Sequence, residues 1–184
     1  MNHRGPEAEL RDFARLQVRA GLLGDDVVLR EVRDAIASDL PGADAAALAA
    51  AWVESARAEL AVEQATWARP TDHERLQDCF AACEAEGLRV LQGIADHWVA
   101  KAELDRLSAA GQRPKGILWF TPPDVWHAVD EGMLEVNLWH PDTANVAPGE
   151  KLLDVVLGQL RAHGLAAHFD EGRIEVDAHW RCPR

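Results

Sequence analysis

Residues 116–139, GILWFTPPDVWHAVDEGMLEVNLW, contain the pattern that decides the fold. Gly116–Phe120 is apolar on both faces, which is typical of a central strand. Residues 121–124, TPPD, form a helix start, with a capping threonine, proline in the first turn and an aspartate that reaches back. Met133–Trp139 then alternates apolar and polar residues, as a half-buried strand does. These residues predict two strands of one sheet joined by a short helix.

Patterns on both sides extend this sheet. Before it, Leu88–Ile94 reads as a strand and Trp98–Ala109 as a helix. After it, a polar loop precedes a helix over Glu150–His163, and Leu165–Phe169 and Arg173–Trp180 form a hairpin. The resulting order is β-α-β-α-β-α-β-β. It predicts a mixed or mostly antiparallel sheet of about five strands with helices on one face.

The first seventy residues are predicted to be helical, because apolar residues recur there at helical spacing and Ala43–Gln64 is rich in alanine. Residues 71–74, TDHE, are a capping box that begins a further helix. The sequence therefore predicts an α+β protein. A helical N-terminal region, residues 1–70, packs on a sheet domain, residues 71–184, and a single domain over the whole chain is the alternative.

The chain is acidic throughout, with 19 Lys+Arg against 31 Asp+Glu and a formal net charge of −12. A protein that binds nucleic acid or an anionic membrane surface needs a basic patch, and the sequence contains none. We therefore expect no nucleic-acid and no membrane partner. A basic protein partner is compatible with this charge, although the charge also serves solubility.

No secretion signal and no membrane-spanning apolar run stand in the sequence, which favours a soluble cytoplasmic protein. Three cysteines, an odd number, do not form a disulfide framework. Cys79 and Cys83 fall on the apolar face of their predicted helix and are expected to be small buried side chains. Because no second pair of ligands accompanies them, we expect no metal and no cofactor.

The polar side of the C-terminal hairpin is the first candidate site. If the turn is centred on Glu171 and Gly172, the numbers of opposing residues sum to 343, so His168 faces Glu175 and Ala166 faces Asp177. His179 continues the same face. A His–carboxylate pair could support proton transfer or hold a metal, whereas the ordinary reading is a solvated sheet face.

A second candidate is the end of the strand at Trp139 and the polar loop after it, with His140 and Asp142. Loops positioned by a sheet often carry function. Trp139 shares the face of Glu135 and Asn137, so we expect it to be exposed or covered by the N-terminal helices. The candidate binding surface comprises seven residues: Trp139, His140, Asp142, His168, Glu175, Asp177 and His179.

Two hypotheses follow for function. The sequence contains no phosphate-binding glycine loop, no nucleophile elbow, no zinc-protease motif and no EF-hand loop. This favours a soluble, non-enzymatic binding or protein-interaction protein. The alternative is a small enzyme or metal-binding protein that uses the His/carboxylate cluster on the outer sheet face.

Several pieces of the chain also resemble a bacterial family classed as a domain of unknown function. They are EQATW at 63–67, residues 76–88, GILWF at 116–120, LRAHGL at 160–165, and IEV at 174–176 with Trp180. The resemblance runs from Gly21 to Cys182. Its motifs are helix caps, a central strand and a terminal hairpin, so it implies a fold and no activity.

Overall fold

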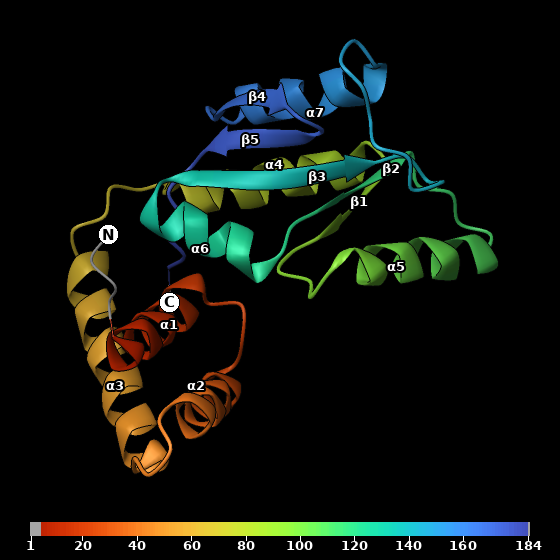
Figure 1. The fold of residues 1–184 in the computed structure, drawn as a ribbon. Coiled ribbons are helices and arrows are strands. Elements are labelled where there is room, and N and C mark those ends of the chain that lie inside the picture. Colours follow the sequence, from red (N-terminus) through yellow and green to blue (C-terminus); the bar gives the residue numbers. More distant parts are fainter. Residues whose placement is uncertain (1–4, 184) are drawn as a thin grey trace. The chain divides into compact units, whose positions relative to one another are not determined.

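The structure is a computed structural model that describes residues 5–183. It contains two compact units, and each is described by itself (Figure 1). The helical unit comprises residues 5–69 with 181–183, and the sheet unit comprises residues 70–180. N-terminal helices followed by a mixed five-stranded sheet confirm the predicted α+β class. That the helices cover the sheet domain stays a prediction.

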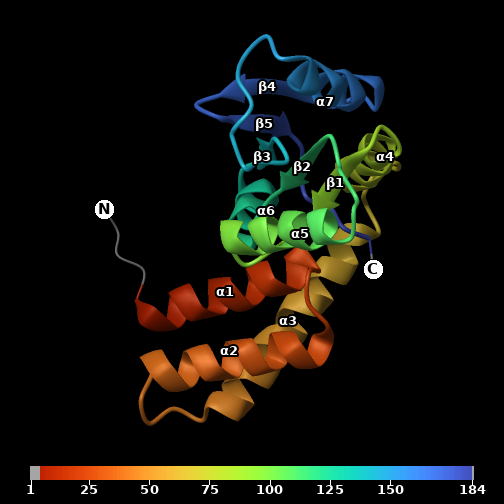
Figure 2. The ribbon, with the colours of Figure 1, turned by 90° about the vertical axis from the view of Figure 1, so that its right-hand side faces the viewer.

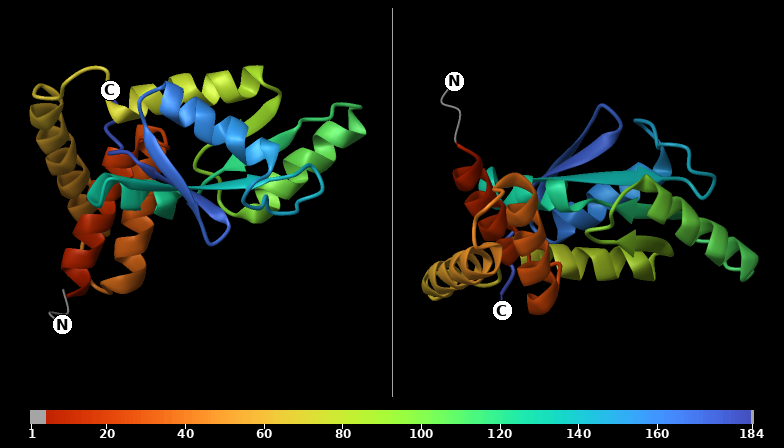
Figure 3. Two further views of the ribbon diagram at one scale, coloured as in Figure 1. Left: turned by 90° about the horizontal axis from the view of Figure 1, so that it is seen from above. Right: turned by 60° about the horizontal axis from the view of Figure 1, so that its bottom comes forward.

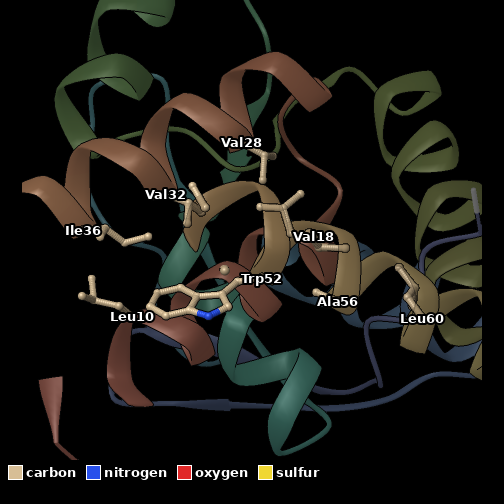
Figure 4. Close-up of a cluster of buried hydrophobic side chains, with 11 residues drawn as sticks. Leu10, Val18, Val28, Val32, Ile36, Trp52, Ala56 and Leu60 are labelled. Carbon is tan, nitrogen blue, oxygen red and sulfur yellow. The ribbon is translucent and has the colours of Figure 1, made fainter. Parts of the chain in front are cut away.

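The helical unit consists of α1 (Pro6–Ala20), α2 (Asp25–Asp39) and α3 (Ala45–Gln64). Each helix turns one apolar stripe inward, and the three stripes form a single core (Figure 4). Its buried members include Leu10, Ala14 and Val18 of α1, Val28, Val32 and Ile36 of α2, and Trp52, Ala56 and Leu60 of α3. Spacings of three and four residues along each helix explain why these side chains meet.

Polar contacts join the ends of the helical unit. Arg19 of α1 forms a two-pronged ion pair with Glu63 of α3, and this hydrogen bond lowers the pKa of Glu63. Gln64 Nε2 donates to the backbone oxygen of Cys182 at 3.1 Å. The backbone at Cys182 is therefore bound to α3.

The sheet unit contains four helices and five strands. In chain order they are α4 (Asp72–Ala85), β1 (Leu88–Leu91), α5 (His97–Ala109), β2 (Gly116–Trp119), α6 (Pro122–Asp130), β3 (Met133–Trp139), α7 (Lys151–Ala162), β4 (Ala166–Asp170) and β5 (Arg173–Asp177). The strand order is β1-β2-β3-β5-β4. β1 and β2 are parallel, and every other pair is antiparallel. This order leaves β1 and β4 as the two edge strands.

The inner face of the sheet carries the main core. Its side chains include Leu118, Leu134, Val136, Leu138, Ile174 and Val176, each at most 2 % exposed. Helices α4 and α7 pack side by side on this face (Figure 3, left). Apolar residues fall at every second position of β3 and β5, so one face of each strand is buried and the other stays polar.

The opposite, outer face is covered over part of its width. Ala100 and Leu104 of α5 pack on Ile117 and Trp119 of β2, so α5 lies on the other side of the strands from α4 and α7 (Figure 2). The sequence pattern predicted helices on one face of the sheet only, and α5 covers part of the other face. Over the middle of β3 and over β5 and β4 the outer face carries mainly polar side chains.

Two arginines hold Glu103 of α5 in place. Arg106 Nε donates to Glu103 Oε2 at 2.7 Å and Arg89 Nε of β1 donates to Oε1 at 2.9 Å. The hydrogen bond from Arg106 is the largest influence that lowers the pKa of Glu103, from its usual value of 4.5 to about 2. The ionised carboxylate therefore ties α5 to the edge strand β1.

A depressed pKa in the folded state has a defined effect on acid stability. The contribution of Glu103 is fully present above pH 4.5 and is lost as the pH falls towards 2. We expect Glu103→Gln to lower the free energy of unfolding near neutral pH, and expect this difference to shrink below pH 4.5. Urea unfolding at several pH values measures it. Glu131→Gln, at an exposed position, is the control, and a difference that grows on acidification would contradict the assignment.

Candidate functional site

The candidate site is the outer face of β3, β5 and β4, where polar side chains stand on three neighbouring strands. They are Glu135 and Asn137 on β3, Arg173, Glu175 and Asp177 on β5, and His168 and Asp170 on β4. The hairpin register is the predicted one, since His168 lies opposite Glu175 and Ala166 opposite Asp177. Positive φ angles of 43° at Glu171 and 92° at Gly172 form the two-residue turn that sets this register.

His168 and Glu175 form a cross-strand pair, with 3.3 Å between Nε2 and Oε2. The histidine side chain is 65 % exposed and the glutamate side chain 27 %. Across residues 5–183, no group of three or more His, Cys, Asp or Glu side chains is arranged to hold a metal ion. As it stands, the pair is a polar contact on an accessible surface.

Carboxylates outnumber cations on this face. Glu135 and Glu175 lie directly opposite each other across β3 and β5, and Arg173 forms an ion pair with Glu135. Asp177, also exposed, follows on the same face of β5, and Asp170 lies at the end of β4. Exposed ion pairs contribute only about 0–1 kcal/mol to stability. These ion pairs therefore add little to stability, and the exposed Asp170 and Asp177 are accessible to a partner.

Trp139 lies at the other end of the same strand face and is half-buried. Its ring meets Trp119 edge-on, with 4.9 Å between the ring centroids, and both rings belong to the cluster beneath α5. The ring is therefore partly buried rather than exposed, and its cover by the N-terminal helices stays a prediction. Within the sheet unit, α5 supplies the cover, because its buried stripe packs on this end of the sheet.

The most exposed aromatic ring of the neighbourhood is Trp98, which sequence analysis did not single out. It is 63 % exposed and lies 4.6 Å from the ring of His97, which in turn lies 6.5 Å from Trp139. Its exposure could have been read from helical spacing. The buried residues of α5 are Ala100, Leu104 and Leu107, and Trp98 does not share their stripe.

His140 and Asp142 hold their own loop. His140 Nε2 and Glu150 Oε2 are 2.6 Å apart, so the first and last residues of the loop are joined. Asp142 Oδ1 accepts from the backbone N–H of Ala144 at 3.1 Å. Among residues 5–183, no hydrogen bond or ion pair links these two side chains to the pair on the hairpin. The candidate surface thus divides into a loop and a strand face.

His179 lies beyond the last strand, since β5 ends at Asp177. Its backbone N–H donates to Asp72 Oδ2 at 3.1 Å, and its ring lies against Gly132, where a Cβ atom would fall 2.5 Å from Cε1. The histidine is exposed, but its contacts join the start of α4 to the turn before β3. It helps to hold the strand face in place.

Cys79 and Cys83 are buried in α4, at most 1 % exposed. The hydrogen bond with Cys83, together with burial, raises the pKa of the Cys79 thiol. A thiol in this setting is protonated at neutral pH and packs as a small apolar side chain. The pair belongs to the core beneath the inner face.

Two surface hollows lie outside the outer face. In the helical unit, a groove of about 820 Å³ runs between α1 and α3, and Arg11 lies 5.5 Å from the ring centroid of Trp52 there. Beside β4, a hollow of about 430 Å³ is lined by Leu157 and Arg161 of α7 and by residues 164–167. The groove's two arginines already pair with Glu7 and Asp12, and Glu59 accepts a hydrogen bond from Ser55, so among the described residues no cation is left there to attract an anionic ligand.

Among residues 5–183, no helix is long and apolar enough to cross a lipid bilayer. Comparison with curated proteins and with solved structures finds no significant match. Comparison with family models does find one, a domain of unknown function named DUF6891, which matches residues 4–184. Because this match spans nearly the whole sequence, the chain belongs to the DUF6891 family.

Proposed function

We propose that the sheet unit is a binding module that recognises a basic protein partner through its outer face. The observation that carries this proposal is the uneven distribution of charge. Residues 70–180 hold 9 Lys+Arg and 19 Asp+Glu, a net charge of −10. The remainder of the chain holds 10 and 12, a net charge of −2. Most of the acidic excess therefore resides in the unit that presents the outer face.

The chemistry of the outer face supports the same proposal. Its carboxylates are spread over three strands, and one arginine and one histidine balance them only in part. A field of one sign accelerates the encounter with an oppositely charged partner. Trp139 and Trp98 adjoin the acidic region and offer the aromatic surface on which interface energy commonly concentrates.

The cysteines indicate the cellular compartment in which we expect this module to act. No disulfide joins Cys79 and Cys83, although they are neighbours on one helix face. Unpaired cysteines are typical of proteins in reducing compartments. We therefore place the proposed interaction in the cytoplasm.

A charge-reversal experiment tests the proposal. The probe is a fluorescent peptide of alternating lysine and glycine, titrated with the full chain at low and physiological salt. The double variant Glu175→Lys, Asp177→Lys is expected to weaken binding at low salt about tenfold or more, since it places two cations where the peptide docks. Fluorescence anisotropy gives the dissociation constants.

The matched control is Asp78→Lys, Glu86→Lys, which changes the net charge equally at two exposed positions on α4 and at its C-terminal end, away from the outer face. It is expected to change the affinity less than threefold, because only the overall field is altered. Equal losses in both variants would show that the peptide responds to net charge alone. That result would overturn the outer face as the binding site.

A further inference from the structure

We infer that two copies of this chain pair through the edge strand β4, so that their sheets join antiparallel and Phe169 of each copy fills the hollow beside β4 of the other. This inference is independent of the basic partner. In the strand order, β4 has β5 as its single neighbour. Its residues lie at the surface of the sheet unit, with Ala166, His168 and Asp170 exposed and Ala167 and Phe169 half-buried.

The backbone of β4 is arranged for such pairing. In an antiparallel ladder, successive residues direct their N–H and C=O groups alternately to the two sides of the strand. The two-residue turn makes Asp170 and Arg173 a hydrogen-bonded pair, so Asp170, His168 and Ala166 bond to β5. Ala167 and Phe169 then direct their N–H and C=O groups outward. Pairing with a second copy satisfies these groups.

β4 also lacks three of the features that usually prevent edge pairing, although Asp170 is charged. Its sequence, AAHFD, contains no lysine and no proline, and its register with β5 is unbroken by a bulge. Natural edge strands are commonly protected by such charges, prolines or bulges. The strand is regular, and its two alanines allow close contact with another strand.

A twofold axis at His168 gives the register. It places Ala167 of one copy opposite Phe169 of the other, and these are the two residues with outward backbone groups. Phe169 pairs with Ile174 on the inner side of the hairpin, so its ring and the methyl group of Ala167 both lie on the inner side. The hollow of about 430 Å³ lies beside Ala167 and is lined also by Leu157 and Leu165. The second copy's Phe169 is an apolar side chain placed to fill it.

Helix α7 extends the match. Leu157 and Arg161 line the hollow, so this side of α7 faces the edge of the sheet. Asp154, Leu157 and Arg161 are spaced by three and four residues and share that side. Neither the carboxylate of Asp154 nor the guanidinium of Arg161 has a partner within residues 5–183. Antiparallel helices centred near Leu157 place Asp154 of each copy beside Arg161 of the other.

Sedimentation equilibrium of the full chain over a range of concentrations tests the inference. The wild type is expected to reach twice the chain mass of 20.2 kDa. Asp154→Arg places two arginines side by side at each of the two symmetric contacts, and Arg161→Asp places two aspartates there. Each single variant is expected to weaken the dimer about tenfold or more, because like charges repel. The double variant exchanges the two charges and is expected to restore the dimer.

Two further variants distinguish a disrupted interface from an unfolded chain. Phe169→Ala removes the side chain that fills the hollow and is expected to yield a monomer whose circular dichroism matches the wild type. Asp78→Arg, on the exposed side of α4, is expected to leave the dimer unchanged. A wild-type chain that stays at 20.2 kDa at every concentration overturns the inference. So does a dimer that is indifferent to all three changes at Asp154, Arg161 and Phe169.

Discussion

Replacing Phe120 by alanine is expected to lower the free energy of unfolding of the sheet unit by about 3–5 kcal/mol. The side chain has no exposed surface. Its ring lies 5.8 Å from the ring of Phe80 on α4 and 5.8 Å from that of Trp180, beyond the end of β5. Alanine at this position leaves a cavity where β2, α4 and the end of the sheet unit meet, and rigid secondary structure limits its collapse.

Urea unfolding followed by near-ultraviolet circular dichroism measures this loss, because Trp119 and Trp180 report on the core of the sheet unit. The control is Phe13→Ala in the helical unit, where the ring is half-buried. It is expected to leave the transition of the sheet unit in place. A loss below about 1 kcal/mol for Phe120→Ala would show that the surrounding side chains close the cavity, which would contradict this prediction.

Local signals explain how much of this fold was predictable. The capping box of Thr71 and Glu74 forms as expected, and Asp124 Oδ2 accepts hydrogen bonds from the backbone and hydroxyl of Thr121. The alternation in Met133–Trp139 predicted the strand with its observed bounds. Such signals depend on residues a few positions apart, so a single sequence contains all the information that they need.

Features that depend on distant residues were not predictable in the same way. In the sheet, β5 lies between β3 and β4 although it follows β4 in the chain. The sequences of β4 and β5 do not predict this order. The first strand ends at Leu91 rather than Ile94, and the backbone N–H of Ile94 bonds to the carbonyl oxygen of Phe120 outside the ladder. Both outcomes follow from tertiary pairing, which outweighs local preference.

The candidate site likewise contains some contacts that the local sequence predicts and others that depend on distant residues. The pair of His168 and Glu175 was predicted because a two-residue turn determines which residues face each other. The contact between His140 and Glu150 spans ten residues of irregular chain, where no periodicity applies. The cover that α5 provides for Trp139 required knowledge of which sheet face that helix occupies.

Gly116→Ala is expected to destabilise the sheet unit by about 2–3 kcal/mol, although it adds only one methyl group. A Cβ atom at Gly116 would lie 2.7 Å from Leu152 Cδ2 and 2.7 Å from the backbone oxygen of Trp139. The leucine side chain could rotate away. The carbonyl belongs to the neighbouring strand β3, so relieving that contact requires β2 and β3 to separate where Ile117 pairs with Trp139.

The added methyl group meets one side chain and one backbone carbonyl, and a double variant separates these two contacts. Adding Leu152→Ala to Gly116→Ala removes the side-chain contact and leaves the contact with the carbonyl, so we expect only partial recovery in urea unfolding. Gly158→Ala is the matched glycine variant, because its position on α7 is open and helical. It is expected to raise stability by about 0.5–1 kcal/mol. Full recovery in the double variant would mean that the strands tolerate the methyl group, and that glycine is required at position 116 only by Leu152.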